Sequence, residues 1–290
     1  MSSRRLQISL AIVGALAGTI AVAAHQALPT LGANGLLHPS RRSAEPAVRD
    51  SHPTLVFTGA GVTLAGWKVP ARAARRGTVV YLHGVADNRG SGLAAVERFR
   101  DRGFDVIAYD SRGHGDSGGT VCTYGFYEKR DLQRVLDSVE SGPVVVMGTS
   151  LGAAVGLQAA ADDRRISAVV AVESFSDLRT VAAERAPWFF TGGVIRQSLA
   201  LAEELGQFPV DEVSPMSAGR RIRIPVLLIH GSEDTETPPE HSRRILGLLH
   251  GPKQLLIVDG AGHNASLQPW VWSRIEAWID AVLDRGGDSD

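Results

Sequence analysis

The sequence contains a single cysteine, Cys122, among its 290 residues. One thiol cannot close a disulfide within the chain, and it cannot supply the ligands of a cysteine-rich zinc or haem site. Basic charge is not in excess either, because 30 Lys and Arg residues stand against 31 Asp and Glu residues. Proteins that neutralise many phosphates usually carry a basic surplus, so this composition predicts no nucleic-acid partner.

Apolar character is moderate, with 44% hydrophobic residues and a mean hydropathy of +0.00, which excludes a many-pass membrane protein. One segment departs from this average, because residues 6–24 carry no charge and follow Arg4 and Arg5. Its length fits an uncleaved membrane anchor, whereas the Ala-Val-Ala of residues 21–23 fits the cleavage site of a secretory signal. Both interpretations of the leader, residues 1–24, predict export, with the remaining chain either secreted or tethered to the membrane.

The rest of the chain predicts a linker followed by one domain. Residues 25–53 contain Pro, Gly, Ser and Arg without periodicity, which is typical of a linker. Residues 54–285 begin with a predicted β pair, Thr54–Thr58 and Val62–Val69, and then alternate strands with helices, which favours an α/β fold with a mostly parallel central sheet and helices on both faces. The predicted parallel strands are Thr78–His83, Asp105–Asp110, Pro143–Gly148, Ile166–Glu173, Pro225–His230 and Gln254–Asp259. The predicted helices are Leu93–Arg102, Glu128–Glu140, Leu151–Ala161, Pro239–Leu249 and Trp270–Leu283.

The alternation is interrupted between residues 176 and 223. An insertion at this point predicts a small cap over the carboxyl ends of the strands, where open parallel sheets bind their ligands. Three consecutive aromatic residues in it, Trp188, Phe189 and Phe190, predict contacts with an apolar acyl group. A pair of ordinary surface helices is the alternative interpretation.

The segment Gly148-Thr149-Ser150-Leu151-Gly152 lies between a predicted strand and a predicted helix. A strand that turns abruptly into a helix holds the central residue in a strained conformation with its side chain exposed. The two flanking glycines face neighbouring backbone, where a side chain would not fit. Ser150 is therefore the predicted nucleophile, and the helix N-terminus places partial positive charge near a developing oxyanion.

A serine hydroxyl needs a base, which is usually a histidine oriented by a carboxylate. His263 follows the last predicted strand in a glycine-rich loop, and Asp234 follows the strand before it. The order Ser150, Asp234, His263 matches the chain order of one known triad fold. Other acids near these strand ends remain alternatives to Asp234, namely Glu173, Asp177, Glu233 and Glu236.

Other polar residues at strand ends have structural interpretations. His83 is predicted to order the loop after its strand through hydrogen bonds to the backbone, and Asp110 with Arg112 is predicted to fix a turn. Residues 113–118 match G-x-G-x-x-G, but the loop continues to Gly125 instead of opening a helix, so no dinucleotide cofactor is expected.

Taken in order, these motifs resemble the landmarks of the α/β-hydrolase superfamily over about residues 54–285. The stretch Leu82–Arg89 and the short cap are similar to its serine-aminopeptidase-like and Bem46-like branch. The resemblance implies an oxyanion hole formed by the backbone N–H groups of Val85 and Leu151. A serine nucleophile disfavours dehalogenase and epoxide hydrolase chemistry, which use aspartate in this fold.

The resulting hypothesis is a carboxylesterase-like serine hydrolase that acts through an acyl-enzyme on a small-molecule ester or other acyl substrate, without metal or cofactor. Amide, peptide or thioester cleavage by the same triad remains an alternative. A non-catalytic binding protein that kept the fold is a further alternative, although no element of the triad is missing. If residues 6–24 form an uncleaved anchor, the membrane is an expected partner of the chain.

Overall fold

The computed structural model describes residues 26–287, so the predicted leader, residues 1–24, lies outside the described residues. Within residues 26–287 one sheet has eight strands in the order β1-β2-β4-β3-β5-β6-β7-β8. Strands β3 to β8 run parallel, and β1 and β2 form an antiparallel pair that adds to the edge at β4. The strands are β1 (Leu55–Thr58), β2 (Thr63–Val69), β3 (Gly77–Leu82), β4 (Phe104–Tyr109), β5 (Val144–Thr149), β6 (Ile166–Val172), β7 (Val226–Gly231) and β8 (Lys253–Val258).

The predicted fold class is therefore confirmed. All six predicted parallel strands are present, and so is the predicted β pair. Strands β3 to β6 are buried along almost their whole length, because helices cover both faces and apolar β-branched side chains fill the space between. The helices are α2 (Pro46–Arg49), α3 (Leu93–Asp101), α4 (Glu128–Leu136), α5 (Leu151–Ala160), α6 (Leu178–Glu184), α7 (Gly192–Gly206), α8 (Pro215–Gly219), α9 (Glu240–Leu248) and α10 (Pro269–Gly287).

Two apolar cores lie between the sheet and its helices. One core joins the sheet to α4, α5 and α9, and the other joins it to α3 and α10. Strand order reverses at β3, which has β4 on one side and β5 on the other. Loops that leave the carboxyl ends of β3 and β5 therefore diverge, and this divergence opens a crevice suited to a ligand.

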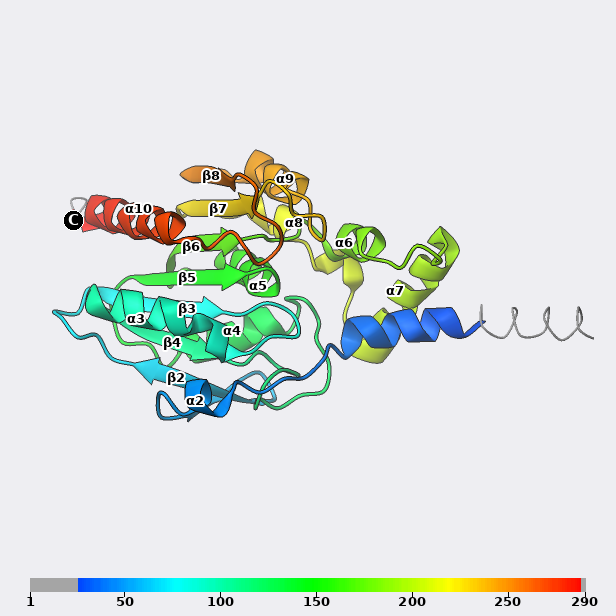
Figure 1. The fold of residues 1–290 in the computed structure, drawn as a ribbon, viewed down its shortest axis with the longest axis horizontal. Helices are drawn as coiled ribbons and strands as arrows, with labels where there is room; N and C mark the ends of the chain where they lie inside the picture. The colour runs from blue at the N-terminus through cyan, green and yellow to red at the C-terminus, as the bar shows by residue number, and fades with distance from the viewer. Residues whose placement is uncertain (1–25, 288–290) are drawn as a thin grey trace, which may run out of the picture.

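The predicted cap is built from α6 and α7, which lie beyond the carboxyl ends of the strands (Figure 1). Helix α8, although within the predicted insertion, packs against α5 and α9 and so belongs to the main body. The cap is held by its own apolar cluster, which includes Leu178 and Val181 of α6 and Leu199 of α7.

The prediction of a linker over residues 25–53 is wrong for its first part, because residues 26–37 form a helix beside α7 (Figure 1). Ala33 and Leu37 are buried in the cap cluster. A Cβ atom on Gly32 would lie 2.3 Å from the Ser198 hydroxyl of α7, so glycine permits the close approach of the two helices. In the described part of the chain, no helix is long and apolar enough to span a bilayer.

The turn after β4 is fixed by a different pair from the predicted one. Asp110 pairs with Arg89, whose Nη1 lies 2.5 Å from Oδ2, and both side chains are fully buried. Asp110 also accepts the backbone N–H of Arg89 at 2.6 Å. Arg112 pairs instead with Asp131 of α4 at 2.7 Å. The buried charge of Asp110 thus depends on a residue that follows β3, so this pair joins two neighbouring strand ends.

The Arg89→Met substitution should therefore lower the free energy of unfolding by about 3–5 kcal/mol, because it leaves the Asp110 carboxylate buried without its cation. Urea unfolding at neutral pH measures the change. The matched control is Arg72→Met, which breaks an exposed pair with Asp101 and should cost less than about 1 kcal/mol. A similar small loss in both variants would contradict the assigned role of Arg89.

Candidate active site

Ser150 stands at the junction of β5 and α5 with φ +48° and ψ −108°. This is a strained conformation for a residue with a side chain. A Cβ atom on Gly148 would lie 2.3 Å from the carbonyl carbon of Gly152, and one on Gly152 would lie 2.1 Å from the carbonyl oxygen of Leu82. The two glycines are therefore needed for the tight turn, as the sequence predicts.

The structure brings Ser150, Asp234 and His263 together at the carboxyl ends of β5, β7 and β8. Nδ1 of His263 lies 2.7 Å from Oδ2 of Asp234. Nε2 of the same ring lies 3.2 Å from the Ser150 hydroxyl. These are the distances that a serine nucleophile, its base and the orienting acid require.

Asp234 is held by more than the histidine. Its Oδ1 accepts the backbone N–H groups of Glu236 at 3.0 Å and of Thr237 at 2.8 Å, and its Oδ2 lies 3.3 Å from Nε2 of the buried His230. Burial disfavours the charged carboxyl, but the hydrogen bonds from His230, His263 and the Thr237 N–H outweigh it and hold the pKa of Asp234 well below its ordinary value. The group is therefore a carboxylate at neutral pH, as an acceptor for the His263 N–H must be.

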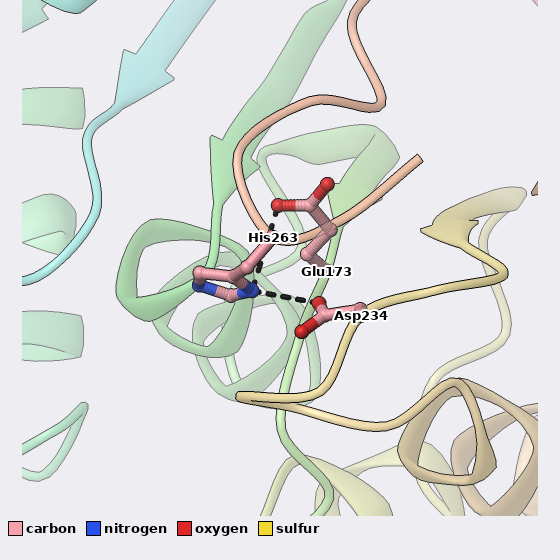
Figure 2. A group of neighbouring side chains, drawn as sticks. All are labelled: Glu173, Asp234 and His263. Carbon is pink, nitrogen blue, oxygen red and sulfur yellow. Dashed lines mark hydrogen bonds and ion pairs between the residues drawn. The ribbon is translucent and has the colours of Figure 1, made fainter. Parts of the chain in front are cut away.

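Figure 2 shows a second carboxylate that faces the same ring nitrogen of His263, and it belongs to Glu173, the residue that follows β6. Oε2 of Glu173 lies 3.7 Å from Nδ1 of His263, farther than Asp234. Its two oxygens accept the backbone N–H groups of Asn264 at 2.6 Å and of Ser266 at 3.2 Å. The distances favour Asp234 as the orienting acid, whereas Glu173 anchors the loop that carries the histidine.

The ligand atoms of Glu173, Asp234 and His263 lie within 4.8 Å of one another, a spacing that could also hold a cation. Nδ1 of His263 already faces Asp234, however, and both Glu173 oxygens already accept backbone N–H groups. Two carboxylates that are committed to N–H donors in this way fit a hydrogen-bonded acid–base pair better than a metal centre.

Other acids considered from the sequence have different surroundings. Asp177 caps α6, where it accepts the N–H of Thr180 at 2.8 Å. The Glu236 carboxylate lies 3.8 Å from the guanidinium of Arg185.

Val85 and Leu151, the expected oxyanion donors, line the same cavity as Ser150. Leu151 opens α5, so its N–H is among the first four amides of the helix and has no partner within it. The helix dipole adds partial positive charge at this end. Both residues thus border the space that a carbonyl attacked by Ser150 would enter.

His83 orders the loop that carries Val85. Its Nε2 accepts the backbone N–H of Ser111 at 2.9 Å, and its Nδ1 lies 2.7 Å from the carbonyl oxygen of Gly84. Burial and the neighbouring His114 lower the pKa of His83 to about 4. The ring is therefore neutral at physiological pH, and it can donate through Nδ1 while it accepts through Nε2.

A cavity of about 390 Å³ opens beside Ser150 under the cap. Phe189 and Phe190 line it, in agreement with their expected place, but Trp188 does not, because its side chain is 95% exposed. Further lining residues come from three elements: Leu31, Gly35 and Leu36 of the helix over residues 26–37, Leu178, Val181 and Arg185 of the α6 region, and Ile195, Ser198 and Leu199 of α7.

Two parts of this cavity are not predicted by the sequence. The pattern of residues 25–53 predicts a linker and not a helical wall, and Arg185 has no distinguishing signal because it is one of many arginines in a chain with few lysines. Arg185 nevertheless lies at the reacting end, with Nη2 at 3.2 Å from Nε2 of His263.

Comparison with known proteins identifies the fold. The family model described as alpha/beta hydrolase fold matches residues 77–213, and the model described as TAP-like protein matches residues 203–279. The uncharacterized protein YqkD of Bacillus subtilis is 30% identical over 65% of this chain. The chain spans 65% of the length of that relative.

Solved structures are similar in fold. The Pyrococcus furiosus esterase Pf2001 has a TM-score of 0.67 and 23% identity, with 86% of this chain and 98% of that chain covered. An acylaminoacyl peptidase of Pyrococcus horikoshii has a TM-score of 0.60 and 16% identity, with 74% of this chain and 38% of that chain covered. The helix over residues 26–37 precedes the region matched by both family models.

Proposed function

The chain belongs to the α/β-hydrolase superfamily, and from that premise we propose that it is a serine hydrolase that cleaves carboxylic esters with apolar acyl groups. The observation that carries the proposal is the hydrogen-bonded series Asp234–His263–Ser150 beside an apolar cavity. A non-catalytic member of the fold would have no need to keep these three groups aligned with free amides at a helix N-terminus.

The proposed reaction begins when the Ser150 oxygen bonds to the ester carbonyl carbon and its proton passes to Nε2 of His263. Asp234 holds Nδ1–H of the ring and stabilises the imidazolium. The N–H groups of Val85 and Leu151 donate to the oxyanion, where the loss of one donor typically costs about 10²–10³ in rate. The C–O bond of the ester then breaks, and His263 gives its proton to the leaving oxygen.

Water resolves the acyl-enzyme by the same route. His263 takes a proton from the water as its oxygen bonds to the acyl carbon, and it returns that proton to Ser150 as the acyl bond breaks. The acid product then leaves the cavity. Apart from the substrate and water, each step uses only groups of the chain itself.

An amidase or peptidase is the second candidate, because the same triad chemistry cleaves amides and because one similar structure is named as an acylaminoacyl peptidase. A panel of butyryl derivatives with ester, thioester and anilide bonds separates the possibilities. We expect the ester to have the highest kcat/KM, and labelling by a fluorophosphonate probe to map to Ser150. A higher kcat/KM for the anilide would favour the amidase, and absence of both turnover and labelling would refute a serine hydrolase.

The Gly35→Leu substitution should shorten the acyl chain that the enzyme accepts. Gly35 lines the cavity, and a Cβ atom there meets no heavy atom within 4 Å, so the new side chain has room to occupy the acyl site. One misfitted methylene costs about 1–3 kcal/mol. We therefore expect kcat/KM for p-nitrophenyl decanoate to fall at least about 10-fold, whereas the acetate should change less than about 2-fold.

Gly247→Leu is the matched control, because Gly247 is also helical and also has open space at its Cβ position but does not line the cavity. The control should leave the chain-length profile as it is in the wild type. Equal profiles in both variants would show that the helix over residues 26–37 does not border the acyl site.

A further inference from the structure

Arg185 is the one charged residue among those that line the cavity in the described part of the chain. It follows α6 as its C-terminal cap and reaches back toward the loop that carries Asp234. Its Nε donates to the Glu236 carbonyl oxygen at 2.9 Å, and its Nη2 donates to the Thr237 hydroxyl at 2.5 Å. The side chain is thus held between the cap and the loop that carries Asp234, at the end of the cavity next to His263.

The position of this guanidinium conflicts with the proposed chemistry of the base. Nη2 lies 3.2 Å from Nε2 of His263, the atom that must accept the proton of Ser150. An N–H donor there competes with the serine hydroxyl for the ring nitrogen. Once Nε2 is protonated, a guanidinium and an imidazolium would stand at contact distance, which like charges disfavour.

The charge of Arg185 is only weakly compensated. The carboxylate of Glu236 lies 3.8 Å from its guanidinium. Its side chain is 62% exposed, so water screens the pair. Within residues 26–287, Nη1 of Arg185 makes no hydrogen bond, so one edge of the planar group is free to bind a second oxygen. Arginine in this state is suited to a bidentate oxyanion.

We propose that Arg185 binds an anionic group, a carboxylate or a phosphate, on the leaving-group side of the ester. This inference rests on the proposed function and adds to it the class of the alcohol. Nε2 of His263 is the atom that returns a proton to the leaving oxygen, so a cation beside it faces the alcohol portion. The apolar cavity receives the acyl portion.

The substrate class that follows is an amphiphile: an apolar acyl chain esterified to an alcohol that carries an oxyanion a few bonds from the ester oxygen. When such an anion pairs with the guanidinium, it neutralises the charge beside His263. The pairing also draws Nη2 from the ring nitrogen, which then accepts the proton of Ser150. The same anion therefore contributes both to binding and to release of the base.

The test compares kcat/KM of the full chain for phenyl butyrate, 3-carboxyphenyl butyrate and 3-phosphonooxyphenyl butyrate. Wild type should prefer at least one anionic ester by about 10–100-fold, the range of a charge-assisted hydrogen bond. In Arg185→Met this preference should disappear, and turnover of phenyl butyrate should rise by roughly 2–10-fold because Nε2 has lost a competing donor. Arg185→Lys should retain part of the preference. The anionic ester that wild type prefers shows whether the site binds a carboxylate or a phosphate.

Arg179→Met is the matched control. Arg179 lies on α6 as well, but it is exposed and pairs with Asp211 at 2.8 Å outside the cavity. It should leave all three rates at their wild-type values. Equal wild-type rates for neutral and anionic esters, or an equal loss on all three in Arg185→Met, would overturn the anion site and leave the serine hydrolase intact.

Binding of the alcohol product decides the inference independently of turnover. Calorimetry should detect 3-hydroxybenzoate or 3-hydroxyphenyl phosphate on wild type, with an affinity that falls about 10–100-fold in Arg185→Met. Phenol should bind both proteins alike. If neither anion binds wild type more tightly than phenol, the anion site is refuted, whereas failure of every ester to react while the anion binds refutes the proposed function alone.

Discussion

Replacement of Ser150 by alanine is expected to lower kcat for an aryl butyrate by about four to six orders of magnitude, the effect of removing a triad nucleophile. The substitution deletes the oxygen that Nε2 of His263 faces at 3.2 Å and leaves the cavity as it is. KM should therefore change little. Steady-state rates with the purified full chain, supported by loss of fluorophosphonate labelling, measure the effect.

Ser198→Ala is the control for this variant. Ser198 also lines the cavity, is also buried, and its hydroxyl has no hydrogen-bond partner in the described part of the chain. Its removal should leave kcat within about 3-fold of wild type, since no hydrogen bond is lost. Substantial turnover by Ser150→Ala, together with undiminished probe labelling, would mean that another residue is the nucleophile.

Replacement of Asp234 by asparagine is expected to lower kcat by about 10⁴. An amide N–H₂ that faces Nδ1 would favour the ring tautomer that carries its proton on Nε2, and that tautomer cannot accept a proton from Ser150. The backbone N–H groups of Glu236 and Thr237 still find an acceptor in the amide oxygen, so the loop should keep its conformation. Steady-state kinetics at neutral pH give the rate, and thermal unfolding checks the fold.

The Asp234→Asn variant should be compared with Glu173→Gln, because Glu173 presents the other carboxylate near His263. Its greater distance and its hydrogen bonds to the loop amides predict a loss well below that of Asp234→Asn. A larger loss in Glu173→Gln than in Asp234→Asn would reverse the assignment and make Glu173 the orienting acid.

The sheet and the convergence of the three side chains could be predicted from sequence because their signals are local. Each buried strand is a short apolar run, and each proposed catalytic residue lies in the turn or loop that follows one. The glycines at 148 and 152 add a steric signal, since each lies against neighbouring backbone. Parallel strands end at one edge, so residues distant in sequence meet there without any knowledge of long-range contacts.

The cavity wall could not be predicted in this way. Pro29, Gly32 and Gly35 lower the helix propensity of residues 26–37, and the helix is stabilised by tertiary contacts that the pattern does not reveal. The backbone N–H of Cys122 donates to the Leu37 carbonyl oxygen at 2.8 Å, and the Tyr124 hydroxyl donates to that of Leu36 at 3.1 Å. Such partners lie more than eighty residues away in sequence.

Arg185 and Trp188 show the same limit at the scale of one side chain. Both lie in the cap, where the sequence pattern indicates an insertion but does not specify which side chains turn inward. The turn after Ala186 directs Phe189 and Phe190 to the cavity and leaves Trp188 in solvent. Likewise, Asp110 pairs with Arg89 and not with Arg112, which is nearer in sequence, because the fold brings the end of β3 beside the end of β4.

The helix over residues 26–37 lines the cavity but lies outside the part of the chain that contains the proposed triad. The proposed nucleophile, base and acid all lie between residues 77 and 279, the stretch that the family models match, whereas this wall of the proposed acyl site precedes it. We therefore expect substitutions in these twelve positions to change the acyl chain length that is accepted and to leave the proposed triad unchanged. We expect a recombinant protein trimmed to the matched stretch to keep the proposed triad and to lose one wall of the cavity.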